Sequence, residues 1–145
     1  MGVSGEPGGT PYDWYARGSA FLDQGNPEAA IVLLEWVLAE DQSAAVLEAY
    51  GRALFDARRY SEAIDVLTRL VERWPDADYG HYALGLSLWR MQRFLSARDH
   101  LAMAFVMRPD RADYGKALAQ VKATLRARIE GGLPLEGPLE TDQAS

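Results

Sequence analysis

Apolar residues recur along this chain with the spacing of amphipathic helices. Between residues 60 and 73, four apolar residues stand at i, i+4, i+7 and i+8: Ala63, Leu67, Leu70 and Val71. This spacing places them on one face of a helix with 3.6 residues per turn. Similar runs occur before and after this one, separated by Gly, Pro, Asn and Asp. The pattern predicts seven helices, over residues 11–24, 27–40, 44–57, 60–73, 78–91, 94–107 and 112–130.

The predicted helices repeat in pairs. Three sets of equivalent residues carry the repeat: Gly18, Gly51 and Gly85; Ala30, Ala63 and Ala97; Leu34, Leu67 and Leu101. The step is 33 residues and then 34, a period typical of stacked helical hairpins. Glycine inside a helix costs roughly 1 kcal/mol relative to alanine. Its recurrence at one place therefore indicates that two helices approach closely there.

These residues give the chain a resemblance to the tetratricopeptide repeat (TPR) family. The third copy carries most of the family pattern, in Leu84-Gly85, Phe94, Ala97, Leu101, Ala104 and Pro109. The second copy offers Tyr50-Gly51, Tyr60, Ala63, Leu67 and Pro75, and the first offers Trp14, Gly18, Phe21, Ala30 and Leu34. Four residues depart from the pattern: Arg17 in place of Leu, Pro27 in place of the turn aromatic, Gln42 in place of the closing Pro, and His81 in place of an aromatic residue.

The resemblance implies an all-α fold, an α-solenoid in which three helix-turn-helix hairpins and a capping helix form a right-handed superhelix. We expect the hairpins over about 11–43, 44–77 and 78–111, and the capping helix over 112–130. The ends of the chain are rich in Gly and Pro, which favours disorder. We therefore expect a disordered leader over residues 1–10 and a disordered acidic tail over residues 131–145.

Composition narrows the function classes. The chain has 145 residues, a net charge of −6 and no cysteine. The acidic charge disfavours nucleic acid and anionic membrane surfaces as partners. No secretory signal or membrane-spanning run is recognised, so we expect a cytoplasmic protein.

Chemistry-bearing motifs are not recognised in the sequence. We find no metalloprotease helix, phosphate-binding loop or nucleophile elbow. His81 and His100 lack ligand spacing, and we expect structural roles for both. We therefore predict a protein that is not an enzyme and has no cofactor and no metal site.

In TPR proteins the first helix of each pair lines a concave groove that takes peptides or partner helices. The positions that correspond here are Tyr12, Tyr15, Ser19, Leu22, Arg52, Phe55, Tyr79, Tyr82, Leu86, Trp89 and Arg90. Aromatic residues and arginine dominate binding energy at protein interfaces. Arginine also binds carboxylates through paired hydrogen bonds. We therefore expect a protein or peptide partner with apolar or aromatic side chains and some acidic character.

The family's best-known groove chemistry is a clamp of Lys, Asn and Arg that holds a chain-terminal carboxylate. The corresponding positions here are Tyr15, Ser19, Ala49, Tyr79 and Ala83. The side chains that form the clamp are missing from them, so we do not expect a chaperone-tail clamp.

The sequence thus favours a non-catalytic adaptor or assembly factor, and two alternatives stand beside it. One is a self-associating structural subunit, possible as a homodimer through Val32 and Trp36, which occupy a face where the second repeat has Asp65 and Arg69. The apolar character of Val32 and Trp36 would also be explained if the leader or the first helix folds over Trp36. The other alternative is an accessory chaperone for a specific client.

The tail adds a hypothesis of its own. Leu133, Leu135 and Leu139 alternate with Pro, Glu136 and Glu140, so the tail itself has the apolar and acidic character expected of the partner. On this hypothesis the tail occupies the groove of its own or of a neighbouring molecule, and a solvated tail is the alternative.

Overall fold

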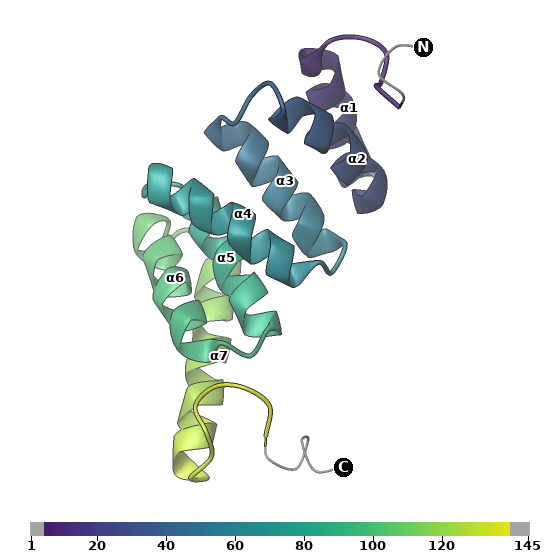
Figure 1. Ribbon diagram of the computed structural model, residues 1–145. Helices are drawn as coiled ribbons and strands as arrows, with labels where there is room; N and C mark the ends of the chain where they lie inside the picture. The colour runs from purple at the N-terminus through teal and green to yellow at the C-terminus, as the bar shows by residue number, and fades with distance from the viewer. Residues whose placement is uncertain (1–4, 140–145) are drawn as a thin grey trace, which may run out of the picture. The chain divides into compact units, whose positions relative to one another are not determined.

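The computed structural model describes residues 5–139. This part of the chain is all-α, with seven helices packed as consecutive hairpins (Figure 1). They are α1 (Pro11–Asp23), α2 (Pro27–Leu38), α3 (Ala44–Asp56), α4 (Tyr60–Arg73), α5 (Asp78–Arg90), α6 (Phe94–Met107) and α7 (Ala112–Glu130). The seven predicted helices are confirmed, and each helix ends where expected or one to two residues earlier.

The chain divides into two compact units, Met1–Leu70 and Val71–Ser145, and the boundary falls within α4. In the first unit α2 packs against α1 and α3. In the second unit α6 packs against α5 and α7, and α7 also contacts α5. No helix among the described residues is both long and apolar enough to cross a bilayer.

Each hairpin closes on a glycine. A Cβ atom added to Gly18 would lie 3.2 Å from Leu34 Cγ, and one added to Gly85 would lie 2.6 Å from Leu101 Cγ. Gly51 faces Leu67 in the same way, with 2.7 Å from the added Cβ to Leu67 Cγ. The repeated glycines are therefore required by helix contact, as the sequence predicts. Ala30, Ala63 and Ala97 are fully buried beside these contacts.

The turn inside each hairpin repeats as well. Gly25, Arg58 and Gln92 all have positive φ, of 76°, 63° and 60°. The backbone N–H of the next residue then donates to the carbonyl five residues before it, as in Asn26 to Phe21 and Arg93 to Leu88. This is the Schellman motif, which satisfies carbonyls left free at a helix end. Only the first copy uses the glycine that the left-handed conformation favours.

The leader is partly ordered by its contacts with α1. Thr10 and Asp13 form a capping box: the Asp13 carboxylate accepts from the Thr10 N–H at 2.9 Å, and the Thr10 hydroxyl oxygen accepts from the Asp13 N–H at 3.3 Å. The Gly8 carbonyl accepts hydrogen bonds from the Trp14 indole at 3.0 Å and from Arg17 at 3.3 Å. The sequence predicts a disordered leader, whereas Gly8 and Thr10 make defined hydrogen bonds to residues of α1. The first four residues of the leader lie outside the described part of the chain.

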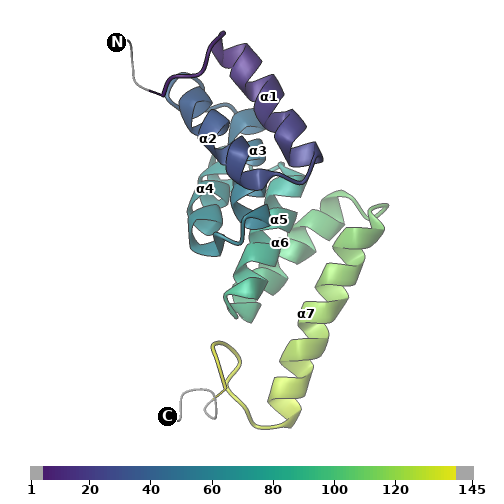
Figure 2. The same cartoon turned by 90° about the vertical axis from the view of Figure 1, so that its right-hand side faces the viewer.

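Helix α7 covers the second unit as a capping helix. Tyr114, Leu118, Val121 and Leu125 are buried along one stripe of this helix. After α7 the chain turns back through Gly132, which has a φ of 64° (Figure 2). Residues 133–137 then make specific hydrogen bonds to α6, α7 and the α5–α6 turn. This differs from the expected disordered tail, and residues 140–145 lie outside the described residues.

Candidate functional site

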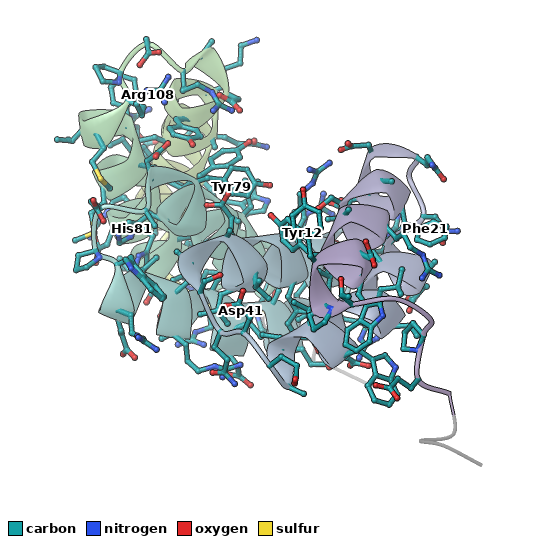
Figure 3. All side chains as sticks on the ribbon, turned by 90° about the horizontal axis from the view of Figure 1, so that it is seen from above. Tyr12, Phe21, Asp41, Tyr79, His81 and Arg108 are labelled. Carbon is teal, nitrogen blue, oxygen red and sulfur yellow. The ribbon has the colours of Figure 1, made fainter. Side chains whose placement is uncertain are left out.

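The first unit carries a pocket at the start of α1 and α3. It has a volume of about 320 Å³, and its lining includes Pro11, Tyr12, Tyr15, Val37, Asp41, Ser43, Ala45 and Val46. Tyr12, which is labelled in Figure 3, lines this pocket, and its side chain is 79% exposed. Most of the lining is apolar, and Asp41 and Ser43 supply polar groups. Such a pocket suits an apolar side chain with a nearby hydrogen-bonding group.

Two other predicted site residues of α1 differ in burial. Ser19 is half-buried. Leu22 is only 5% exposed and belongs to the core of the first unit. The side chain of Leu22 is therefore enclosed by its own unit, although the register of the repeat placed it among the groove residues.

Arg52 lies between two carboxylates on the first unit. Its guanidinium is 3.8 Å from Asp23 and 3.7 Å from Asp56. Burial raises the pKa of Asp56 above its ordinary value, and Arg52 opposes that rise. A carboxylate brought by a partner would therefore meet an arginine that already has acidic neighbours. Beside it, Phe55 makes an edge-to-face contact with Tyr60, with ring centroids 5.4 Å apart.

The predicted site residues of the second unit form one face of α5. Tyr79, Tyr82, Leu86 and Trp89 are all half-buried, and Arg90 is exposed. Tyr79 (Figure 3) lies 6.0 Å from Tyr82 between ring centroids. Tyr82 in turn stacks on Tyr114 of α7 at 4.6 Å. Burial raises the pKa of the Tyr82 hydroxyl, and the nearby Asp113 carboxylate adds to the rise.

Tyr114 of α7 supports the aromatic face of α5 through its stacking on Tyr82. It is fully buried, and its hydroxyl donates to Asp78 at 2.7 Å. Burial raises the pKa of Tyr114, and the Asp78 carboxylate raises it further. The guanidinium of Arg111 lies over the ring at 4.7 Å. No sequence signal indicated that Tyr114 stacks on Tyr82.

Trp89 has an internal partner too. Its ring meets Phe94 edge to face at 5.1 Å, and Arg128 lies over Phe94 at 4.8 Å. The aromatic face of α5 is thus supported from behind by residues of α6 and α7. Part of each ring stabilises the second unit, and part remains accessible.

The second surface predicted from sequence, around Val32 and Trp36, lies on α2. Val32 is 56% exposed. Trp36 is half-buried and meets Trp14 edge to face at 6.1 Å. The two indoles line a pocket of about 350 Å³ together with leader residues, among them Glu6, Gly9 and Thr10. The leader and α1 thus lie beside Trp36, which is the alternative explanation that the sequence left open.

His81 and His100 come together, although they are 19 residues apart in the chain. Their Nδ1 atoms are 3.0 Å apart, and His81 Nε2 is 2.9 Å from the Pro75 carbonyl. Burial lowers the pKa of His100, and the neighbouring His81 lowers it further. This pairing fits the structural role expected for both residues. Across residues 5–139 no group of three or more His, Cys, Asp or Glu side chains is arranged to hold a metal ion.

Comparison with known proteins agrees with this geometry. A family model described as "Tetratricopeptide repeat" matches residues 15–78. The TPR domain of Sgt2 from Aspergillus fumigatus superposes with a TM-score of 0.79 at 15% identity, covering 100% of this chain and 97% of that one. No curated protein sequence matches significantly.

Two further solved structures are similar to the chain. One is the second TPR domain of human RPAP3 in complex with the HSP70 peptide SGPTIEEVD, with a TM-score of 0.70 and 18% identity over 78% of this chain and 98% of that one. The other is MamA, with a TM-score of 0.76 and 22% identity over 83% of this chain and 71% of that one. With the repeated Gly–Leu contacts and the paired helices, these findings show that the chain carries tetratricopeptide repeats, matched over residues 15–78, and has the fold of a TPR domain.

Proposed function

We propose that this chain is a non-catalytic protein–protein interaction module, an adaptor or assembly factor that captures a peptide or a partner helix on the first helices of its hairpins. The observation that carries the proposal is the pocket beside Tyr12 and Tyr15. A tyrosine that is 79% exposed next to an apolar pocket gains little from its own fold. It is well suited to lie against an apolar side chain of a partner.

The aromatic face of α5 supports the same proposal. Tyr79, Tyr82 and Trp89 leave part of their rings accessible on one helix face. Ring contacts with Tyr114 and Phe94 hold Tyr82 and Trp89 in place. Pre-ordered aromatic side chains lose little conformational entropy when they bind. We propose that each of the two surfaces takes apolar or aromatic side chains of the partner.

The partner differs in chemistry from the peptides of the RPAP3 relatives. Those domains are known in complex with the peptides SRMEEVD and SGPTIEEVD. The positions of the family's carboxylate clamp are Tyr15, Ser19, Ala49, Tyr79 and Ala83 in this chain. We therefore propose a partner recognised mainly through apolar groups, with an acidic group near Arg52. That acidic group would replace Asp23 at the guanidinium, so Asp23→Asn should strengthen binding of such a partner.

The test compares substitutions at two residues whose side chains are almost equally exposed. Tyr12→Ser removes a tyrosine that is 79% exposed, and Val106→Ser removes a valine on α6 that is 78% exposed. Partners captured from the source cell would be compared for the wild type and the two variants, and the binding segment then mapped with synthetic peptides. SGPTIEEVD serves as the negative control peptide.

We expect a partner that the wild type and Val106→Ser retain and Tyr12→Ser loses. Anchor residues of this kind typically contribute about 2 kcal/mol or more, which is roughly a thirtyfold change in affinity. Equal capture by all three proteins would contradict the proposal. Loss of a dimer in Val32→Asp, measured by sedimentation, would instead favour the self-associating subunit.

A further inference from the structure

The tail docks on the second unit through a defined set of hydrogen bonds. Arg128 is only 8% exposed, and its guanidinium donates to the carbonyls of Pro134 at 3.0 Å and Gly137 at 2.7 Å. The same guanidinium lies over the Phe94 ring at 4.8 Å. Arg128 thus connects the first residue of α6 to two backbone carbonyls of the tail. The turn at Gly132 brings the tail within its reach.

The start of α6 supplies the second part of this contact. Its N-cap residue is Arg93, whose side chain makes no capping hydrogen bond. Arginine is a donor only and cannot accept from the free N–H groups of a helix start. The Glu136 carboxylate fills that role, accepting from the Leu95 N–H at 3.0 Å. A carboxylate is the group that the partial positive charge of a helix N-terminus favours.

The α5–α6 turn completes the site. Gln92 has a φ of 60°, and its carbonyl accepts from the Gly137 N–H at 2.9 Å. Gly137 itself has a φ of 83°, a conformation that other residues rarely adopt. A segment that fits here therefore needs a carboxylate followed directly by glycine. Arg128 must also reach one backbone carbonyl before the carboxylate residue and one after it, as it does at Pro134 and Gly137.

We propose that the α5–α6 turn, the start of α6 and Arg128 form a docking site for an extended Glu-Gly segment, and that residues 134–137 of this chain are its resident, releasable ligand. Glu136 and Pro134 remain exposed while docked, so the contact consists largely of hydrogen bonds and buries little apolar surface. Attachment through a short linker gives the tail a high effective concentration at the site. A free segment of the same chemistry binds only after the tail leaves.

The experiment uses the full chain in two forms, the wild type and Gly137→Pro. Proline has no N–H to donate to Gln92 and cannot adopt the φ of Gly137. The probe is a fluorescent peptide with the sequence of residues 131–140, GGLPLEGPLE. Two control peptides are used: one has glutamine in place of the glutamate that corresponds to Glu136, and the other has that glutamate exchanged with the following glycine.

We expect the probe to bind Gly137→Pro at least about tenfold more tightly than the wild type, because the variant's own tail no longer competes. The glutamine peptide should bind about two- to fivefold more weakly, the range expected for one charge at a helix N-terminus. The exchanged peptide keeps the composition and should lose binding. Equal affinity for both hosts, or equal binding of the exchanged peptide, would overturn the proposal.

A second measurement does not depend on the proline variant folding. Amide hydrogen exchange by NMR should show protection of the Leu95 N–H in the wild type and faster exchange in Glu136→Gln. Unchanged exchange would overturn the assignment of Glu136 as the cap of α6.

Sedimentation of the wild type and Gly137→Pro shows whether the docked tail comes from the same chain or from a second copy. A dimer that dissociates in Gly137→Pro would mean that a second copy supplies the tail, and would overturn docking within one chain.

Discussion

The Nδ1 atoms of His81 and His100 lie 3.0 Å apart, while His81 Nε2 lies 2.9 Å from the Pro75 carbonyl oxygen. Because that carbonyl can only accept, His81 Nε2 carries a proton and His81 Nδ1 is left as an acceptor. The Nδ1–H of His100 is then the donor between the rings.

This pair predicts a loss of stability in mild acid. The pKa of His100 in the folded protein lies below the ordinary value of 6.5, chiefly because of burial. The unfolded chain therefore binds more protons between the two pKa values, and the free energy of unfolding falls as the pH drops through 6.5 toward the folded pKa. Urea denaturation between about pH 7.5 and about pH 5 measures this change. His100→Gln should flatten the profile in this range, and an identical slope in the variant would contradict the prediction.

The glycines inside the hairpins predict a graded response to alanine. In Gly85→Ala the new Cβ would lie 2.6 Å from Leu101 Cγ and 3.3 Å from the Ala97 carbonyl oxygen. We expect a loss of about 1–3 kcal/mol from overpacking, reduced by the roughly 1 kcal/mol that alanine gains in a helix.

Gly18→Ala is the matched comparison, because its Cβ would lie 3.2 Å from Leu34 Cγ. A small shift of that side chain would relieve the contact, so the helix gain should leave stability within about 0.5 kcal/mol of the wild type. Thermal unfolding of the two variants tests the order. A larger loss in Gly18→Ala than in Gly85→Ala would refute it.

Much of the fold follows from the sequence because it depends on local spacing. The starts of the seven helices, the closing glycines and the buried stripe of α7 are set by residues within one or two helical turns of each other, or by one repeat step. The candidate site could be predicted less completely. Leu22 lies deeper than Tyr12, because the depth of a residue depends on how α1 packs on its neighbours.

Contacts between elements that are far apart in the sequence could not be predicted, for a related reason. Tyr82 and Tyr114 stack only because α5 and α7 meet, and Glu136 reaches Leu95 across 41 residues of sequence. The acceptor for the tail at Gln92 is a backbone carbonyl, which leaves no trace in residue type. The sequence shows Glu136 as an acidic residue of the tail, but it does not show that Leu95 is its partner.

The turns of the first unit predict opposite effects of two substitutions. Gly25 has a φ of 76° and open space around it, so Gly25→Ala should cost roughly 1 kcal/mol through backbone strain alone. Arg58 holds the equivalent position with a φ of 63°, so Arg58→Gly should stabilise the protein by up to about 1 kcal/mol. Denaturant unfolding measures both changes. The same sign for both variants would be inconsistent with the motif.

The start of α1 predicts a link between the capping box and the leader. Thr10→Ala removes the side-chain cap of the Asp13 N–H and should cost about 1 kcal/mol. The backbone and hydroxyl of Thr10 lower the pKa of Asp13, so the variant should bring the Asp13 pKa closer to its ordinary value. NMR titration of the Asp13 carboxyl measures this. An unchanged titration would show that the hydroxyl contributes little.

The repeated turns are closed by main-chain groups alone, and this has a consequence for how the chain can diversify. Gly25, Arg58 and Gln92 occupy one structural position with a flexible, a cationic and an amide residue. Because the joint tolerates each of them, single substitutions there can alter what the end of a hairpin displays while leaving its architecture intact. The ends of the hairpins are thus positions at which new recognition properties can evolve at small structural expense.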